Sequence, residues 1–263
     1  MKATVLVPAK WFESKSSPKT IRALVLLMAL IGPQVRADEQ ALKLPVKEDW
    51  SGISRITKDN DWLAVPGFIG YRGDKLAGKP GVSPQEILSD GSSTPVSVIA
   101  NQKNPTLRTG GVAEFDGIAN PTVALRGSAT ANAPFLLLNL DTRGKRNISV
   151  SYKLRDLDAS TNNTVAPVAL QYRTGTEKVF TDVPAAFAPD ASIAAGRATL
   201  LTPIAVTLPE AANDQAKLQI RWITADASGN DEWIGIDDIV VTGEDVTVTA
   251  GSQSNEGSTK SAN

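Results

Sequence analysis

Apolar and polar residues alternate over much of the chain with a period of two. Between 148 and 155, the even positions Ile148, Val150, Tyr152 and Leu154 are apolar and the odd positions are polar. Such alternation is typical of a β-strand that buries one face. The same pattern predicts strands at 122–126, 168–172, 204–208 and 217–223. Residues 135–140 are almost continuously apolar, which predicts a central strand covered on both faces.

Turn-forming residues separate these runs, among them Asn120-Pro121, Arg143-Gly144 and the stretch 228–230. Only 83–88 favours a short helical turn. Many short strands divided by Gly and Pro predict an all-β fold, an antiparallel jelly-roll-like β-sandwich in a single domain. Its expected core consists of Val123, Leu125, Leu138, Ile148, Val150, Tyr152, Leu170, Leu218, Ile220 and Trp222.

The two ends of the chain differ from this body. Residues 1–37 have the basic, apolar and small-residue segments of a signal peptide, with an apolar run of ten residues at 23–32. That run is too short to span a bilayer of about 30 Å, although an uncleaved N-terminal anchor is an alternative. We therefore expect a lead-in at 38–44, the β-sandwich domain at 45–243, a polar linker-like tail at 244–263, and a secreted or periplasmic location in a bacterium.

The composition excludes several classes of chemistry. The 263-residue chain has no histidine and no cysteine. It therefore lacks Ser-His-Asp and Cys-His nucleophiles and any histidine-ligated zinc. Without residues 1–37, which hold six basic side chains and one acid, 21 basic and 27 acidic residues remain. This acidic excess argues against tight nucleic-acid binding.

Four segments, taken in order, are similar to a known family: 61–74, 110–115, 119–125 and 229–238. Together they resemble the N-terminal β-sandwich accessory module of large secreted bacterial nucleases and phosphoesterases of the endonuclease/exonuclease/phosphatase type. The resemblance covers residues 45 to 243. The catalytic domain of such proteins uses His, Asp and Asn around a divalent metal, and a chain without histidine does not inherit that activity. The resemblance therefore implies the accessory module alone, as a stand-alone copy or as the front portion of a longer enzyme.

Acidic residues near both ends of the predicted domain suggest a metal site. Glu48 and Asp49 precede Trp50, and Asp237 and Asp238 lie in the last predicted strand. If the first and last strands pair, these carboxylates approach one another, and a Ca²⁺ ion would relieve their repulsion. Adjacent strand residues face opposite ways, so we expect only one of Asp237 and Asp238 to be a ligand. The alternative is that each aspartate is solvated or caps a turn.

Three aromatic residues beside Gly, Pro and Asp are candidates for stacking on a sugar ring: Trp62, Tyr71 and Trp233. The alternative is that they fill the ends of the sandwich. The resulting expectation is a non-catalytic module that binds a glycan or another extracellular polymer, or presents a hydrolase to one, with no membrane contact after signal cleavage. The sequence leaves the oligomeric state open. An enzyme that uses carboxylates alone is a further hypothesis.

Overall fold

The computed structural model describes residues 39–158, 164–192 and 200–247. The predicted signal peptide and most of the predicted tail lie outside these residues. No helix among the described residues is long and apolar enough to cross a membrane.

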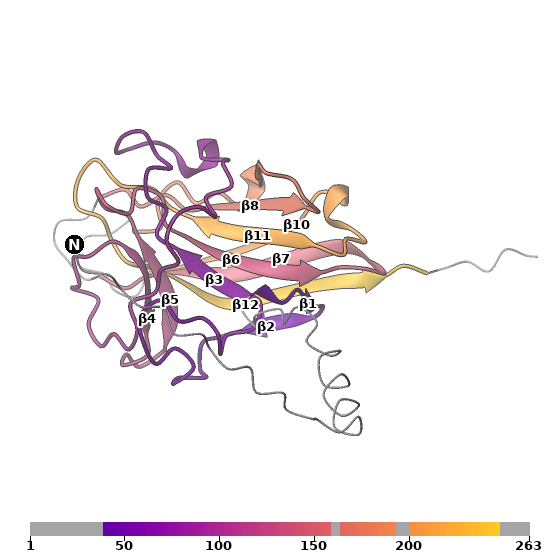
Figure 1. Cartoon of the computed structure of the whole chain (residues 1–263), viewed down its shortest axis with the longest axis horizontal. Coiled ribbons are helices and arrows are strands. Elements are labelled where there is room, and N and C mark those ends of the chain that lie inside the picture. The colour runs from indigo at the N-terminus through magenta and orange to yellow at the C-terminus, as the bar shows by residue number, and fades with distance from the viewer. Residues whose placement is uncertain (1–38, 159–163, 193–199, 248–263) are drawn as a thin grey trace, which may run out of the picture. The chain divides into compact units, whose positions relative to one another are not determined.

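Twelve strands in the described residues form two sheets (Figure 1). The first sheet contains β1 (Leu42–Lys43), β3 (Phe68–Tyr71), β6 (Phe135–Asp141), β8 (Ala169–Thr174), β9 (Thr181–Asp182) and β11 (Leu218–Ile223). The second sheet contains β2 (Val46–Glu48), β4 (Gly111–Phe115), β5 (Thr122–Arg126), β7 (Lys145–Asp156), β10 (Leu201–Thr207) and β12 (Ile234–Asp245). The described residues also contain the short 3₁₀ helices η2 (Pro84–Glu86), η3 (Pro184–Ala186) and η4 (Glu210–Ala212).

All pairings between the named strands except the two-residue β1–β6 contact are antiparallel, so the predicted all-β, antiparallel sandwich is confirmed. The ten predicted core residues are all at most 2% exposed. The core forms because the apolar sides of both sheets face each other, for example Leu154 and Ile236 of the second sheet and Trp222 of the first.

The strands extend further at both ends than the pattern predicts. The expected lead-in contains β1, because Leu42 pairs in register with Leu140 and packs against the core. The expected tail begins inside β12, which continues to Asp245 beside Lys145.

Strand β7 connects two ends of the sandwich that matter below. It begins at the turn by which the chain passes from β6 in the first sheet to β7 in the second, and we call this end the hairpin end. It finishes at Asp156, among loops that we call the loop end. Figure 1 shows β12 beside β7 along this length. Twelve extended residues at about 3.3 Å each place these ends about 40 Å apart.

Candidate functional site

The acidic residues near the two chain ends do come together. Strand β2 pairs with β12, with Glu48 opposite Ile239, so the predicted meeting of the first and last segments is correct. Glu48, Asp49 and Asp238 line one hollow of about 370 Å³. Asp237 lies outside that lining.

Asp237 and Asp238 point to the same face, which corrects the expectation that they face opposite ways. The pairing register of β12 shifts between Asp237 and Val240, and Asp238 has a φ of 49°. Such a bulge adds one residue to the strand and interrupts the alternation of side chains. Asp237 then accepts from Arg155 at 2.7 Å, and Asp238 accepts from Lys153 at 2.6 Å.

Each of these carboxylates already has a polar or cationic partner. Glu48 accepts two hydrogen bonds from Arg55, at 2.8 and 2.5 Å, and Asp49 accepts from Ser51. Within the described part of the chain, no group of three or more acidic side chains is placed to hold a metal ion. Arginine and lysine thus supply the charge compensation that was assigned to Ca²⁺. Calcium binding here stays a prediction.

The predicted aromatic platform is wrong for both tryptophans. Trp62 and Trp233 are 0% exposed, so neither presents a ring face to a ligand. Each instead holds a loop, because Trp62 Nε1 donates to the carbonyl of Ser97 and Trp233 Nε1 donates to that of Leu107. Tyr71 is half-buried and stacks on Phe135 with ring centroids 4.9 Å apart. The alternative interpretation, that aromatic rings fill the ends of the sandwich, fits the two tryptophans.

The loop end contains a polar pocket of about 420 Å³ that the sequence did not reveal. Its lining comes from four separate segments of the chain and consists of Thr106, Leu107, Arg108, Arg126, Asp158, Asn230, Asp231 and Glu232. Only the segment 230–232 belongs to a stretch that the sequence had marked as rich in carboxylates. The other residues are separated from it by 70 residues or more, and no pattern in the sequence links them.

Arg126, at the end of β5, joins two walls of this loop-end pocket. Its Nε donates to the carbonyl of Asp231 at 2.9 Å, and its Nη1 donates to the carbonyl of Arg108. Beneath them, Trp233 packs edge-on against Phe115 at 5.3 Å and binds Leu107 through its Nε1 at 2.7 Å. The pocket is therefore held in shape by a guanidinium group and a buried indole.

At the loop end, burial raises the pKa values of two carboxyl groups. Loss of solvent raises the pKa of Asp231 from 3.8 to about 6, and the nearby charge of Asp226 acts in the same direction. Burial likewise raises the pKa of Asp156, at the end of β7, to about 6. Oδ2 of Asp156 is buried and accepts no hydrogen bond from a described residue. This end therefore concentrates carboxyl groups that hold their protons more strongly than free aspartate does.

Chemically, the loop-end pocket combines acceptors and donors in a small space. Its carboxyl groups accept hydrogen bonds, while the guanidinium groups of Arg108 and Arg126 and the amide of Asn230 donate them. Its volume falls within the usual 300–1,000 Å³ range of small-molecule sites. A ligand with many hydroxyl groups, each both donor and acceptor, matches such a lining.

Comparison with known proteins finds no matching family model and no matching curated protein. Similar solved structures include a carbohydrate-binding module in complex with β-1,4-galactotriose, at 11% identity and a TM-score of 0.32 over 48% of this chain and 73% of that chain. A module specific for non-crystalline cellulose matches at 18% identity and a TM-score of 0.37, over 50% of this chain and 82% of that chain. A xylan-binding module matches at 8% identity and a TM-score of 0.38, over 78% of this chain and 99% of that chain. These likenesses are distant and concern the fold.

Proposed function

We propose that this chain is an exported, non-catalytic β-sandwich module that binds a glycan or a similarly hydroxyl-rich extracellular polymer at the loop-end pocket. The observation that supports it is the convergence of carboxyl, guanidinium and amide groups from four segments on one hollow. Arg126 and Trp233 hold those segments in place before any ligand arrives.

Such a preformed site limits the entropy lost on binding, because the lining side chains need little reordering. Its lining contains no aromatic side chain, so affinity would come from hydrogen bonds rather than from stacking. Hydrogen bonds to charged groups contribute about 1.5–3 kcal/mol each. We therefore expect modest affinity with strict dependence on hydroxyl stereochemistry.

Calorimetric titration of the chain with a panel of neutral oligosaccharides and polysaccharides tests this proposal. Asp231→Asn keeps an acceptor for the N–H of Ala227, and Arg108→Gln removes an exposed guanidinium group, so both variants should fold. Each should weaken binding about tenfold, which corresponds to about 1.4 kcal/mol. Lys58→Gln, an exposed change outside the pocket lining, should bind as the wild type does. Binding that is unchanged in both pocket variants would refute the site.

One observation favours a second function, an enzyme that uses carboxylates alone. A carboxyl group with a pKa of about 6 in a polar pocket has the property of a general acid. Product analysis separates the two functions, because a binding module leaves the oligosaccharide at its original length. Cleavage that Asp231→Asn abolishes would establish the enzyme instead.

The earlier alternative, the front portion of a secreted nuclease or phosphoesterase, has no support from the comparisons. It predicts an in-frame catalytic domain encoded immediately downstream. Sequencing the gene beyond residue 263 tests it directly.

A further inference from the structure

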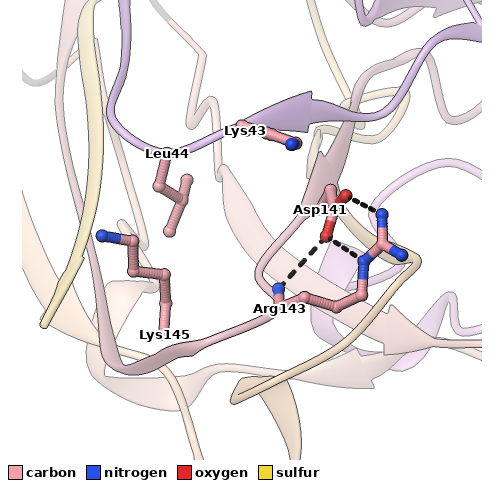
Figure 2. Close-up of a pocket in the computed structure, with 5 residues that line it drawn as sticks. All are labelled: Lys43, Leu44, Asp141, Arg143 and Lys145. Carbon is pink, nitrogen blue, oxygen red and sulfur yellow. Dashed lines mark hydrogen bonds and ion pairs between the residues drawn. The ribbon is translucent and has the colours of Figure 1, made fainter. Parts of the chain in front are cut away.

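A second hollow, of about 400 Å³, lies at the hairpin end and has the opposite chemistry. Lys43, Leu44, Asp141, Arg143 and Lys145 line this hairpin pocket, and Figure 2 shows their arrangement. Strand β1 supplies the first of them, and the end of β6, the turn after it and the start of β7 supply the last three. The pocket thus brings three cationic groups and one carboxylate together in a chain whose net charge is −1.

The single carboxylate is fully engaged by its neighbour. Asp141 accepts from the backbone N–H of Arg143 at 3.1 Å and from its Nε at 2.9 Å, and Arg143 Nη2 also donates to it. These bonds lower the pKa of Asp141 to about 2, so the group stays ionised at neutral pH. Both oxygens of Asp141 bind Arg143, and the charge of Lys43, its partner in the β1–β6 register, also favours the ionised carboxylate without a hydrogen bond to it. One carboxylate thus faces three cationic groups in this lining.

The two lysines are open to a ligand to different degrees. Lys43 is exposed, and its side chain forms no ion pair or hydrogen bond with any residue that the structure describes. Lys145 pairs with Asp245 at 2.6 Å, but the side chain of Asp245 is 82% exposed. Such exposed pairs contribute about 0–1 kcal/mol, so a ligand anion competes with Asp245 on nearly equal terms.

The walls of the hairpin pocket also suit a ring-shaped ligand. In Figure 2, the side chain of Leu44 lies between the Lys43–Asp141–Arg143 group and Lys145. An apolar side chain flanked by ammonium groups matches a sugar ring, which has C–H faces and, in acidic sugars, a negatively charged substituent. A bare inorganic anion would make no use of the apolar wall.

We propose that the hairpin pocket binds anionic groups, carboxylates or sulfates, of an acidic polysaccharide, with Lys43 and Lys145 as cationic ligands on the two sides of Leu44. This site is separate from the loop-end pocket, and it recognises its ligand by charge rather than by the pattern of hydroxyl groups. A polymer that engages both ends of the sandwich would gain from the high effective concentration of its second segment.

Affinity electrophoresis and calorimetry with three soluble polymers test the inference: polygalacturonate, dextran sulfate and neutral dextran. The wild type should bind one or both polyanions at least about tenfold more tightly than dextran at low ionic strength, and salt should weaken that binding by screening. The polyanion that binds identifies the anionic group as carboxylate or sulfate. The double variant Lys43→Gln/Lys145→Gln should lose most of the preference, because glutamine keeps part of the stem and removes the charge.

Lys103→Gln is the matched control, since Lys103 is an exposed lysine in the segment before β4 and lies outside the lining of the hairpin pocket. It should bind polyanions as the wild type does. Arg108→Gln, in the loop-end pocket, should also retain the preference, which keeps failure of this site distinct from failure of the proposed function. Polyanion binding no tighter than dextran binding, or a double variant indistinguishable from the wild type, would overturn the inference.

Discussion

The pKa values of aspartate side chains shift in opposite directions at the two ends of the sandwich. At the loop end, burial raises the pKa values of Asp156 and Asp231 to about 6. At the hairpin end, Asp141 is also largely covered, with 8% exposure, but its pKa falls to about 2. The difference is the partner, because Arg143 donates to Asp141 while Oδ2 of Asp156 has no hydrogen-bond donor among the described residues.

This contrast shows that burial alone does not decide the charge of a carboxyl group. Desolvation favours the neutral form, and a hydrogen-bonding cation favours the ionised form. At the loop end, the fully buried Trp233 lies beneath the pocket, so its loss should be costly. The hairpin end is an exposed charge cluster whose changes should affect binding more than stability.

Trp233→Ala should produce the largest effect. It removes a side chain with 0% exposure and leaves the carbonyl of Leu107 without its indole donor. Loss of a buried tryptophan costs about 3–5 kcal/mol of unfolding free energy. Urea denaturation would measure this, and Trp233→Phe should cost clearly less because it keeps ring packing against Phe115. A loss below about 1 kcal/mol in the alanine variant would show that the loop end is not tightly packed.

Asp156→Asn should raise stability at neutral pH. The folded pKa of about 6 exceeds the ordinary value of 3.8, so the unfolded chain releases this proton first as pH rises. The protonated group stabilises the fold below about pH 4, and that contribution is lost as pH rises towards about 6. A two-unit difference corresponds to about 3 kcal/mol, which is an upper bound for the gain at pH 7.

Urea midpoints at pH 4 and pH 7 measure that gain. The wild type should lose more stability between these values than Asp156→Asn does. Glu86→Gln, at an exposed carboxylate, should follow the wild type. Parallel profiles for Asp156→Asn and the wild type would mean that Asp156 is not held neutral by burial.

Asp141→Asn should have a smaller effect with the opposite sign. The folded pKa of about 2 lies below 3.8, so ionised Asp141 stabilises the fold above about pH 4, and this is lost as pH falls towards 2. Arg143 is 64% exposed, so solvent limits the contribution to at most about 1 kcal/mol. Thermal unfolding should show a larger decrease in the variant's midpoint at pH 7 than at pH 2.5, and an equal shift at both would point to lost packing instead.

Lys43→Gln should have the smallest effect on stability, within about 0.5 kcal/mol of the wild type, because the residue is exposed and forms no ion pair with a described residue. The substitution should weaken the binding of polyanions without this change in stability. A measurable loss of stability would indicate a structural role for this lysine and would weaken the comparison between the two ends.

Much of the fold was predictable because strand patterns are local. Ile148, Val150 and Tyr152 show their buried side in the sequence itself, and all three are in the core. The pairing of β2 with β12 was also expected from the acidic residues at both ends of the domain. The bulge at Asp238 was not, since nothing in Gly235-Ile-Asp-Asp-Ile239 distinguishes a regular strand from one with an extra residue.

The candidate sites were less predictable than the fold. Trp62 and Trp233 looked like exposed aromatics because they stand beside glycine, proline and aspartate, yet the structure covers both with loops. Arg126 gave no signal as the group that joins two pocket walls, because its partners at 108 and 231 are far from each other along the chain.

By itself, the sequence determined the class of fold, the residues of the core and the kinds of chemistry that the chain lacks. Period-two alternation is visible among neighbouring residues, and the absence of histidine and cysteine follows from composition alone. Only the tertiary structure decided which charged groups meet. Asp237 meets Arg155 and Asp238 meets Lys153, across 82 and 85 residues of sequence. Such contacts arise when segments far apart in the chain pack together, so no local pattern encodes them. The contact between Asp141 and Arg143 spans only two residues, and there the structure decided that the two side chains turn toward each other.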